Sequence, residues 1–230
     1  MEINEIHNDS YKIKKIVMTN DAPIEGTELP LPLKYNFFML LVGRPGSGKT
    51  TFAINLLNKR KKNTFYKKFH KVYIFSNSFK TISEDIKLPE DRIFDGIDEL
   101  PRVIEDIEQT DDKTLILIDD CVSDIKNVEW MQKLIYNRRH KGGGISIIIT
   151  TQVYNKLPLN LRKCASDLVF WNTSNKQEFK SIYNDYIDLT MENWMKLLKY
   201  VFKDDPHNFL WYKTNDRMYF KNFNLLQFEE

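Results

Sequence analysis

Residues 43–50 read Gly-Arg-Pro-Gly-Ser-Gly-Lys-Thr, a complete G-x-x-x-x-G-K-[ST] phosphate-binding loop. An apolar run at residues 35–42 precedes the loop, and apolar residues at helical spacing follow it over 49–60. Glycines allow backbone N–H groups to curl around an anion, and the N-terminus of the following helix adds partial positive charge. The strand–loop–helix context therefore predicts a phosphate-bearing ligand at this point of the chain.

Two side chains at the end of the loop have defined roles in such a site. Lys49 is placed to reach the β- and γ-phosphates of a nucleotide, and the Thr50 hydroxyl to ligate Mg²⁺. The residues that we expect to contact the nucleotide are Gly43, Arg44, Pro45, Gly46, Ser47, Gly48, Lys49, Thr50 and Thr51. A nucleotide with β- and γ-phosphates, together with Mg²⁺, is thus the ligand that this loop predicts.

The length of 230 residues fits one large α/β domain, or one domain with a small extension. The formal net charge is +2, so nothing in the overall charge demands a polyanionic partner. No apolar run approaches the roughly 18–20 residues that a membrane-spanning helix needs, so no membrane partner is expected.

Short apolar runs alternate with helically patterned segments up to Trp171. We expect strands at 36–42, 71–76, 92–94, 114–118, 145–149 and 168–171, and helices at 49–60, 98–109, 126–140 and 159–163. Because the strands are almost entirely apolar, they predict a mostly parallel sheet with helices on both faces.

The pattern changes on either side of this region. Residues 1–34 are polar and contain three prolines, which indicates an N-terminal arm, so that the domain itself spans 35–230. Residues 174–230 are expected to pack on that domain as helices and a β-hairpin. The helices are expected at 175–187 and 191–202, and the hairpin strands at 209–212 and 218–220.

Two acidic residues end the apolar run at 114–118. Asp119 is expected to hold Mg²⁺, and Asp120 to orient or deprotonate an attacking water. A further apolar strand ends at Gln152, which would lie near the γ-phosphate because ligands bind at the carboxyl ends of parallel strands. Two alternatives stay open: Asp120 as a cap for the next segment, and Gln152 as a polar strand end that only solvates a loop.

Five segments occur in an order that resembles the poxvirus-type virion DNA-packaging ATPases of the FtsK–HerA superfamily, which occur in large DNA viruses and virophages. The most specific part is an Arg-His pair before a glycine-bounded strand that ends in Gln, followed by Pro-x-x-x-Arg. The resemblance covers roughly residues 35–222. The segments are 43–50, 116–120, 137–140, 150–152 and 157–162.

This resemblance implies a RecA-like P-loop NTPase that assembles into a homo-oligomeric ring and hydrolyses ATP at subunit interfaces. It implies translocation of double-stranded DNA, without sequence preference, into a viral capsid. Capsid vertex or portal proteins are the implied partners. The host cytoplasm, in the viral factory, and the virion are the implied locations.

The resemblance also assigns residues. It matches Lys49 and Thr50 to the phosphate loop, Asp119 and Asp120 to the magnesium and water positions, and Gln152 to the sensor. Many members have Glu where this chain has Asp120, so the base here is one methylene shorter.

Arg139, directly before His140, best matches the arginine finger that acts on a neighbouring subunit's nucleotide. Arg138 and Arg162 are alternatives. The cations at 138–140 could instead only complement the C-terminal dipole of the preceding helix.

The sequence contains two candidate segments for contact with DNA. The densest basic segment, 59–71, interleaves lysines with aromatic residues, and cations of this kind bind phosphates without sequence preference. A solvated helix end explains the same charges equally well. The glycine-rich segment 141–144 is another candidate for a loop that faces DNA.

Three other functions share the phosphate loop. A helicase or conjugation-type pump would use the same core but usually carries further modules. A slow nucleotide-gated adapter would not need the water-positioning set of Asp119, Asp120 and Gln152. A GTPase is disfavoured because no Asn-Lys-x-Asp segment occurs, and no arginine-rich lid of a kinase is identifiable.

Overall fold

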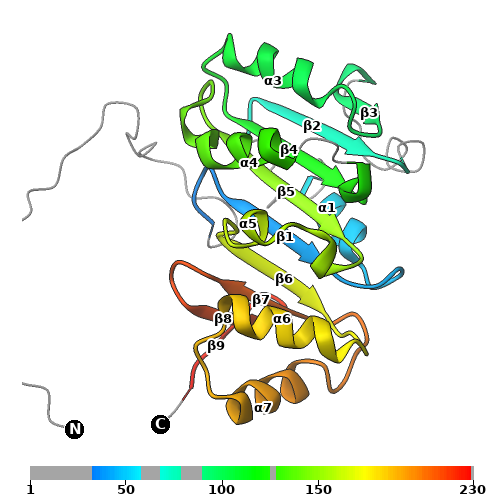
Figure 1. The fold of residues 1–230 in the computed structure, drawn as a ribbon, viewed down its shortest axis with the longest axis vertical. Helices are drawn as coiled ribbons and strands as arrows, with labels where there is room; N and C mark the ends of the chain where they lie inside the picture. Colours follow the sequence, from blue (N-terminus) through cyan, green and yellow to red (C-terminus); the bar gives the residue numbers. More distant parts are fainter. Residues whose placement is uncertain (1–32, 58–67, 79–89, 125–127, 229–230) are drawn as a thin grey trace, which may run out of the picture.

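The structure is a computed structural model that describes residues 33–57, 68–78, 90–124 and 128–228. The described residues form a single sheet of nine strands in the order β3-β2-β4-β5-β1-β6-β7-β8-β9, with helices on both faces (Figure 1). The expected arm at 1–34 falls almost wholly outside these residues, as does most of the basic segment at 59–71. No helix of the described parts is long and apolar enough to cross a membrane.

The first six strands are parallel, and the last three run antiparallel to their neighbours. The parallel strands are β1 (Phe38–Val42), β2 (Lys71–Ser76), β3 (Ile93–Asp95), β4 (Thr114–Asp119), β5 (Ile145–Thr151) and β6 (Asp167–Trp171). The antiparallel strands are β7 (Phe209–Lys213), β8 (Met218–Lys221) and β9 (Asn224–Leu226). Strands β1, β4, β5 and β6 are buried along their whole length, which explains their continuous apolar sequences.

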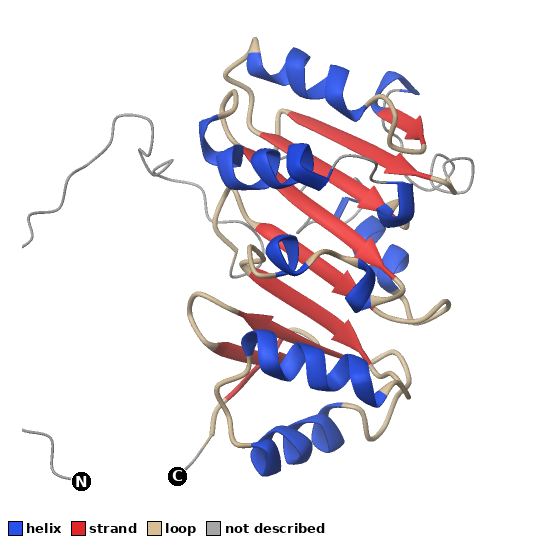
Figure 2. Ribbon diagram, in the orientation of Figure 1, coloured by secondary structure: helices blue, strands red, loops and turns tan. Residues whose placement is uncertain are grey.

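Helices cover the two faces unequally, as the ribbon coloured by secondary structure shows (Figure 2). The helices are α1 (Lys49–Leu57), α3 (Leu100–Glu108), α4 (Val128–Asn137), α5 (Leu159–Arg162), α6 (Lys176–Tyr186) and α7 (Met191–Val201). Short 3₁₀ turns are η3 (Glu90–Arg92), η4 (Val122–Asp124), η5 (Arg138–His140) and η6 (Tyr154–Lys156). Helix α1 packs with Phe52 and Leu56 on one face, while α3 to α7 cover the other.

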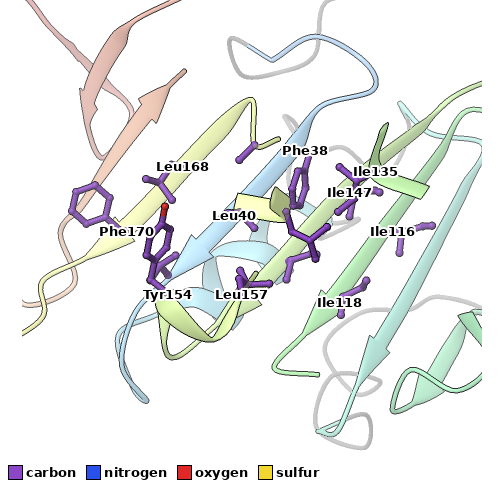
Figure 3. Packing of buried hydrophobic residues seen from close by; sticks show 14 of the residues in the cluster. Phe38, Leu40, Ile116, Ile118, Ile135, Ile147, Tyr154, Leu157, Leu168 and Phe170 are labelled. Carbon is purple, nitrogen blue, oxygen red and sulfur yellow. The ribbon is translucent and has the colours of Figure 1, made fainter. Parts of the chain in front are cut away.

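The core on the face covered by α3 to α7 is built from alternate residues of neighbouring strands. Phe38 and Leu40 of β1 point to the same side as Ile116 of β4 and Ile147 of β5 (Figure 3). Their neighbours along the strands, such as Met39, point to the α1 face. Both faces of the central strands are therefore apolar, which confirms the prediction of a parallel sheet covered on both sides.

The predicted α/β architecture is confirmed, with two adjustments. The helix expected at 126–140 is described from Val128, and at Asn137 it tightens into the 3₁₀ turn η5. The hairpin expected at 209–212 and 218–220 is formed by β7 and β8. Its first strand, β7, pairs antiparallel with β6, so the hairpin and the additional strand β9 extend the central sheet.

The glycines of segment 141–144 have a packing explanation. Gly143 lies so close to the α3–β4 loop that a Cβ atom there would be 2.1 Å from the carbonyl oxygen of Asp111. Gly144 has a φ of +96°, and a Cβ atom there would lie 2.2 Å from the side-chain oxygen of Asn36. Close packing and a left-handed backbone conformation thus account for these glycines without a role in DNA binding.

We therefore expect Gly143→Ala to lower the free energy of unfolding by about 1–3 kcal/mol, because the backbone of the α3–β4 loop must move. Urea-induced unfolding measures this change. Gly46→Ala is the control, since its φ is +75° but a Cβ there meets nothing within 4 Å. Backbone strain alone predicts about 1 kcal/mol for that control. Equal stability of Gly143→Ala and the original chain would contradict the packing explanation.

Candidate active site

The candidate site lies where the carboxyl ends of β1, β4 and β5 meet at one edge of the sheet. β1 leads into the phosphate loop, β4 ends at Asp119, and β5 leads into Gln152. β5 is hydrogen-bonded between β1 and β4, so the three strand ends are adjacent. Residues that are more than 100 positions apart in the chain therefore converge at this edge (Figure 1).

The phosphate loop is anchored to β5 and shaped by glycines. The Gly43 N–H donates to the Thr151 carbonyl oxygen at 3.1 Å, which continues the ladder past the end of β1. Gly46 and Gly48 have φ values of 75° and 108°, in the left-handed region that favours glycine. Helix α1 begins at Lys49, so the last two residues of the motif form its first turn. The segment thus adopts the strand–loop–helix geometry that the sequence predicted.

Lys49 is buried at the base of the loop, with 5% of its surface exposed. Its amino group donates to the carbonyl oxygens of Gly43 at 2.7 Å and Arg44 at 3.3 Å. Burial lowers the pKa of Lys49 from its ordinary value, while the charges of Asp120 and Asp119 act in the opposite direction. The ammonium group is thus held by the loop, near enough to the acidic pair to interact with both of its charges.

Asp119 is the buried centre of the site. Its Oδ1 accepts hydrogen bonds from Thr50 Oγ1 at 3.0 Å and Thr150 Oγ1 at 2.8 Å, and its Oδ2 accepts one from Ser76 Oγ at 3.3 Å. The Thr50 hydroxyl and the Asp119 carboxylate are thus neighbouring oxygen donors. Mg²⁺ prefers oxygen ligands and takes one or two carboxylates beside substrate phosphates, so this pair fits the predicted metal position.

Asp120 and Gln152 are brought together beside that centre. The Gln152 side-chain amide donates to Asp120 Oδ2 at 2.9 Å. Asp120 adopts a φ of 54°, which is uncommon for a residue with a side chain. Its N–H donates to Thr150 Oγ1 at 2.9 Å, and this bond helps hold the unusual backbone conformation. The predicted base and sensor therefore form one polar pair at the open side of the site.

Two of the three candidate arginines are engaged within the chain. Arg138 is buried and donates to the carbonyl oxygens of Asn36 at 2.7 Å and Ile135 at 2.6 Å. Burial lowers its pKa, and the neighbouring Arg139 adds to that shift. Arg138 therefore joins the end of α4 to the start of β1, which is a structural role.

Arg162 is likewise held in place. Its guanidinium forms an ion pair with Asp185 at 2.9 Å and lies 4.4 Å from the centre of the Tyr154 ring. It joins the segment after β5 to helix α6. Such contacts leave little of its head group for a neighbouring molecule, as its side chain is 12% exposed.

Arg139 differs from both, because it is exposed and no hydrogen bond or ion pair engages its guanidinium within the described part of the chain. It lies in η5, before β5 begins, at the edge of the sheet opposite the phosphate loop. β5 has seven residues, so at about 3.3 Å per residue the two edges are about 20 Å apart. Arg139 therefore cannot reach the phosphate loop of its own chain.

Two residues of the site were not predicted as such: Thr150 and Ser76. Both stand at the carboxyl end of a strand next to β4, and Ser76 pairs directly with Asp119 in the sheet register. Hydroxyl residues at strand ends are common, so they become informative only once the strand order is known. Once the order is known, the hydroxyl residues at the carboxyl ends of β2 and β5 indicate that they surround Asp119.

Comparison with known proteins identifies the family and the fold of the chain. A family model described as "Poxvirus A32 protein" matches residues 31–201. This match confirms the resemblance to the poxvirus family that the ordered motifs indicated. No curated protein sequence matches the chain.

Solved structures share the fold at low sequence identity. The DNA-packaging ATPase B204 of Sulfolobus turreted icosahedral virus is 16% identical with a TM-score of 0.61, over 84% of this chain and 99% of that one. B204 of Sulfolobus turreted icosahedral virus 2, in complex with AMPPCP, is 17% identical with a TM-score of 0.57, over 83% and 99% of the two chains. EssC (ATPases 2 and 3) of Geobacillus thermodenitrificans is 15% identical with a TM-score of 0.57, over 85% and 41%. The RecA-like fold is thereby confirmed.

Thr150 provides a test of the geometry around Asp119. Thr150→Val removes the hydroxyl that donates to Asp119 and accepts from the Asp120 N–H, at nearly constant volume. We expect a loss of about 10- to 100-fold in ATP turnover, as for other residues that orient a metal ligand. Steady-state phosphate release measures it.

Thr150→Ser should retain most of the turnover, because it keeps the hydroxyl. Thr151→Val is the matched control, since the Thr151 hydroxyl donates to Val153 and not to the acidic pair. Turnover that is the same in Thr150→Val and Thr151→Val would show that the Thr150 hydroxyl does not orient the site.

Proposed function

Because the chain belongs to the poxvirus A32 protein family, we propose that it hydrolyses ATP with Mg²⁺ to drive double-stranded DNA into a viral capsid. The observation that carries the proposal is the convergence of Lys49, the acidic pair and Gln152 at one sheet edge. The described B204 proteins, which share the fold, are named as packaging enzymes and include a complex with AMPPCP. A protein that only bound a nucleotide would not need a polar pair beside the γ-phosphate position.

The proposed chemistry divides among the residues of the site. The loop N–H groups and Lys49 bind the β- and γ-phosphates, and Thr50 and Asp119 are the residues that would hold Mg²⁺. When bound, the metal neutralises charge that develops on the phosphates. Asp120 accepts a hydrogen bond from Gln152, so the two together can orient a water and take up its proton. Thr150 keeps both acids in position.

The arginine finger completes the proposal. Arg139 lies at the sheet edge opposite its own phosphate loop, so it can act only on the nucleotide of a neighbouring subunit. A head-to-tail contact between copies would bring the η5 edge of one subunit to the loop of the next, and such contacts form a ring when the rotation between copies closes. We therefore propose a ring with shared interface sites, with capsid proteins and DNA as its partners.

Steady-state ATP hydrolysis with Mg²⁺ tests the function directly. The rate is measured with and without long double-stranded DNA, over a series of protein concentrations, with Lys49→Ala as the inactive control. Stimulation by DNA and a more than linear rise with protein concentration would support a DNA motor with shared sites. A rate that is linear in protein and indifferent to DNA would contradict it.

Arg139→Ala should retain nucleotide binding and lose about 10³-fold in hydrolysis, because the transferring phosphoryl group loses a stabilising charge. Mixing it with Lys49→Ala protein should restore part of the activity, since some interfaces then combine an intact loop with an intact Arg139. Arg102→Ala is the matched control, as Arg102 is an exposed arginine on α3 whose ion pair is with Glu99. Full activity of Arg139→Ala alone would remove this residue from the mechanism.

A further inference from the structure

The C-terminal part of the chain packs against the phosphate loop. Nδ1 of His207 lies 3.3 Å from the carbonyl oxygen of Ser47, and the Trp171 indole N–H donates to the His207 carbonyl oxygen at 3.1 Å. A Cβ atom on Gly48 would lie 3.8 Å from the Trp171 ring nitrogen and 3.9 Å from the His207 ring. The end of β6 and the segment before β7 thus form a side wall of the loop.

Aromatic residues continue this wall past the start of α1. Phe52 lies three residues after Lys49, and its ring contacts Trp171, Phe209 and Phe223 at centroid distances of 6.0, 5.1 and 5.8 Å. Phe52 and Phe223 are nearly parallel, with 13° between their planes. Three of the four rings are buried, but Phe223 is 52% exposed. It presents an open aromatic surface next to the phosphate loop.

Phe223 is held by the turn between β8 and β9. Asn222 has a φ of 56°, and its side-chain oxygen accepts from the Phe209 N–H at 3.0 Å. The Asn222 N–H donates to the Phe209 carbonyl oxygen at 2.9 Å, and its side-chain amide to Asn208 Oδ1 at 2.9 Å. The exposed ring is therefore fixed to the start of β7 and not left on a free loop.

The strand order gives the direction in which a bound nucleotide must extend. The acidic pair and Gln152 lie on the β4–β5 side of β1, and this side takes the γ-phosphate. The phosphate loop itself follows β1. The α-phosphate and the nucleoside must then extend toward the other neighbours of β1, which are β6 and, beyond it, β7 to β9. Phe223 lies on that side.

We propose that the exposed ring of Phe223, backed by Phe52, is the platform on which the base of the nucleotide stacks. This assignment rests on the proposed binding of ATP at the phosphate loop and adds the residue that recognises the purine. Bases stack well on aromatic rings, and the already stacked, hydrogen-bonded position of Phe223 limits the entropy lost on binding. Stacking of this kind favours a flat base without selecting strongly among purines.

A comparison of ATP with inorganic tripolyphosphate isolates the base. Phe223→Ala should weaken ATP binding by about tenfold, or about 1.4 kcal/mol, and leave tripolyphosphate binding unchanged. Isothermal titration calorimetry with Mg²⁺ measures both affinities. Phe223→Trp should retain ATP affinity because it keeps a flat ring. Phe228→Ala is the matched control, since Phe228 is 55% exposed and its ring packs on Tyr219, away from Phe52.

The possible results separate this inference from the proposed function. If the original chain binds neither ATP nor tripolyphosphate, the proposed nucleotide site itself is wrong. If it binds both, and Phe223→Ala leaves the ATP affinity unchanged, only the base platform is overturned. An equal loss for ATP and tripolyphosphate would also overturn it, because the substitution would then act through the shape of the loop.

Discussion

The carboxylate of Asp119 is the interaction on which the site depends. It is 2% exposed and accepts hydrogen bonds from hydroxyls of β2, β5 and α1. A buried carboxylate is costly unless such donors compensate it, so each of these elements must be in register for the hydrogen bonds to form. The requirement joins the sheet and the phosphate loop into one unit. The proposed metal position is therefore a consequence of how three strands and a helix meet.

The same architecture separates the two halves of the proposed catalytic apparatus. Parallel strands place all their carboxyl ends at one edge, and this edge holds the phosphate loop, the acids and Gln152. The turn with Arg139 lies at the opposite edge because it precedes β5. One copy of the chain thus carries a nucleotide site and a free cation that cannot meet. Under the proposed function, this separation makes hydrolysis dependent on assembly.

The parallel core and the main site residues were predictable because their signals are local. Continuous apolar runs marked the strands, the loop motif marked the phosphate site, and Asp119, Asp120 and Gln152 each follow a strand directly. Ser76 and Thr150 were not predictable, because their importance depends on strand order. The environments of the arginines were not predictable either. Adjacent residues of one short turn differ, since Arg138 is buried and bonded to backbone carbonyl oxygens while Arg139 is exposed, and only the packing of that turn decides which is which.

The antiparallel strands explain how the C-terminal region reaches the phosphate loop. β7 starts at the edge where β6 ends, so it carries the chain away from the loop. β8 reverses again and returns the chain to the loop edge, where the next turn holds Phe223. A single added strand would have left the chain at the opposite edge, where β6 begins. The pairing of β7 with β8, which the sequence showed only as two short β-prone runs, is thus what allows residues after 209 to form part of the wall beside the nucleotide site.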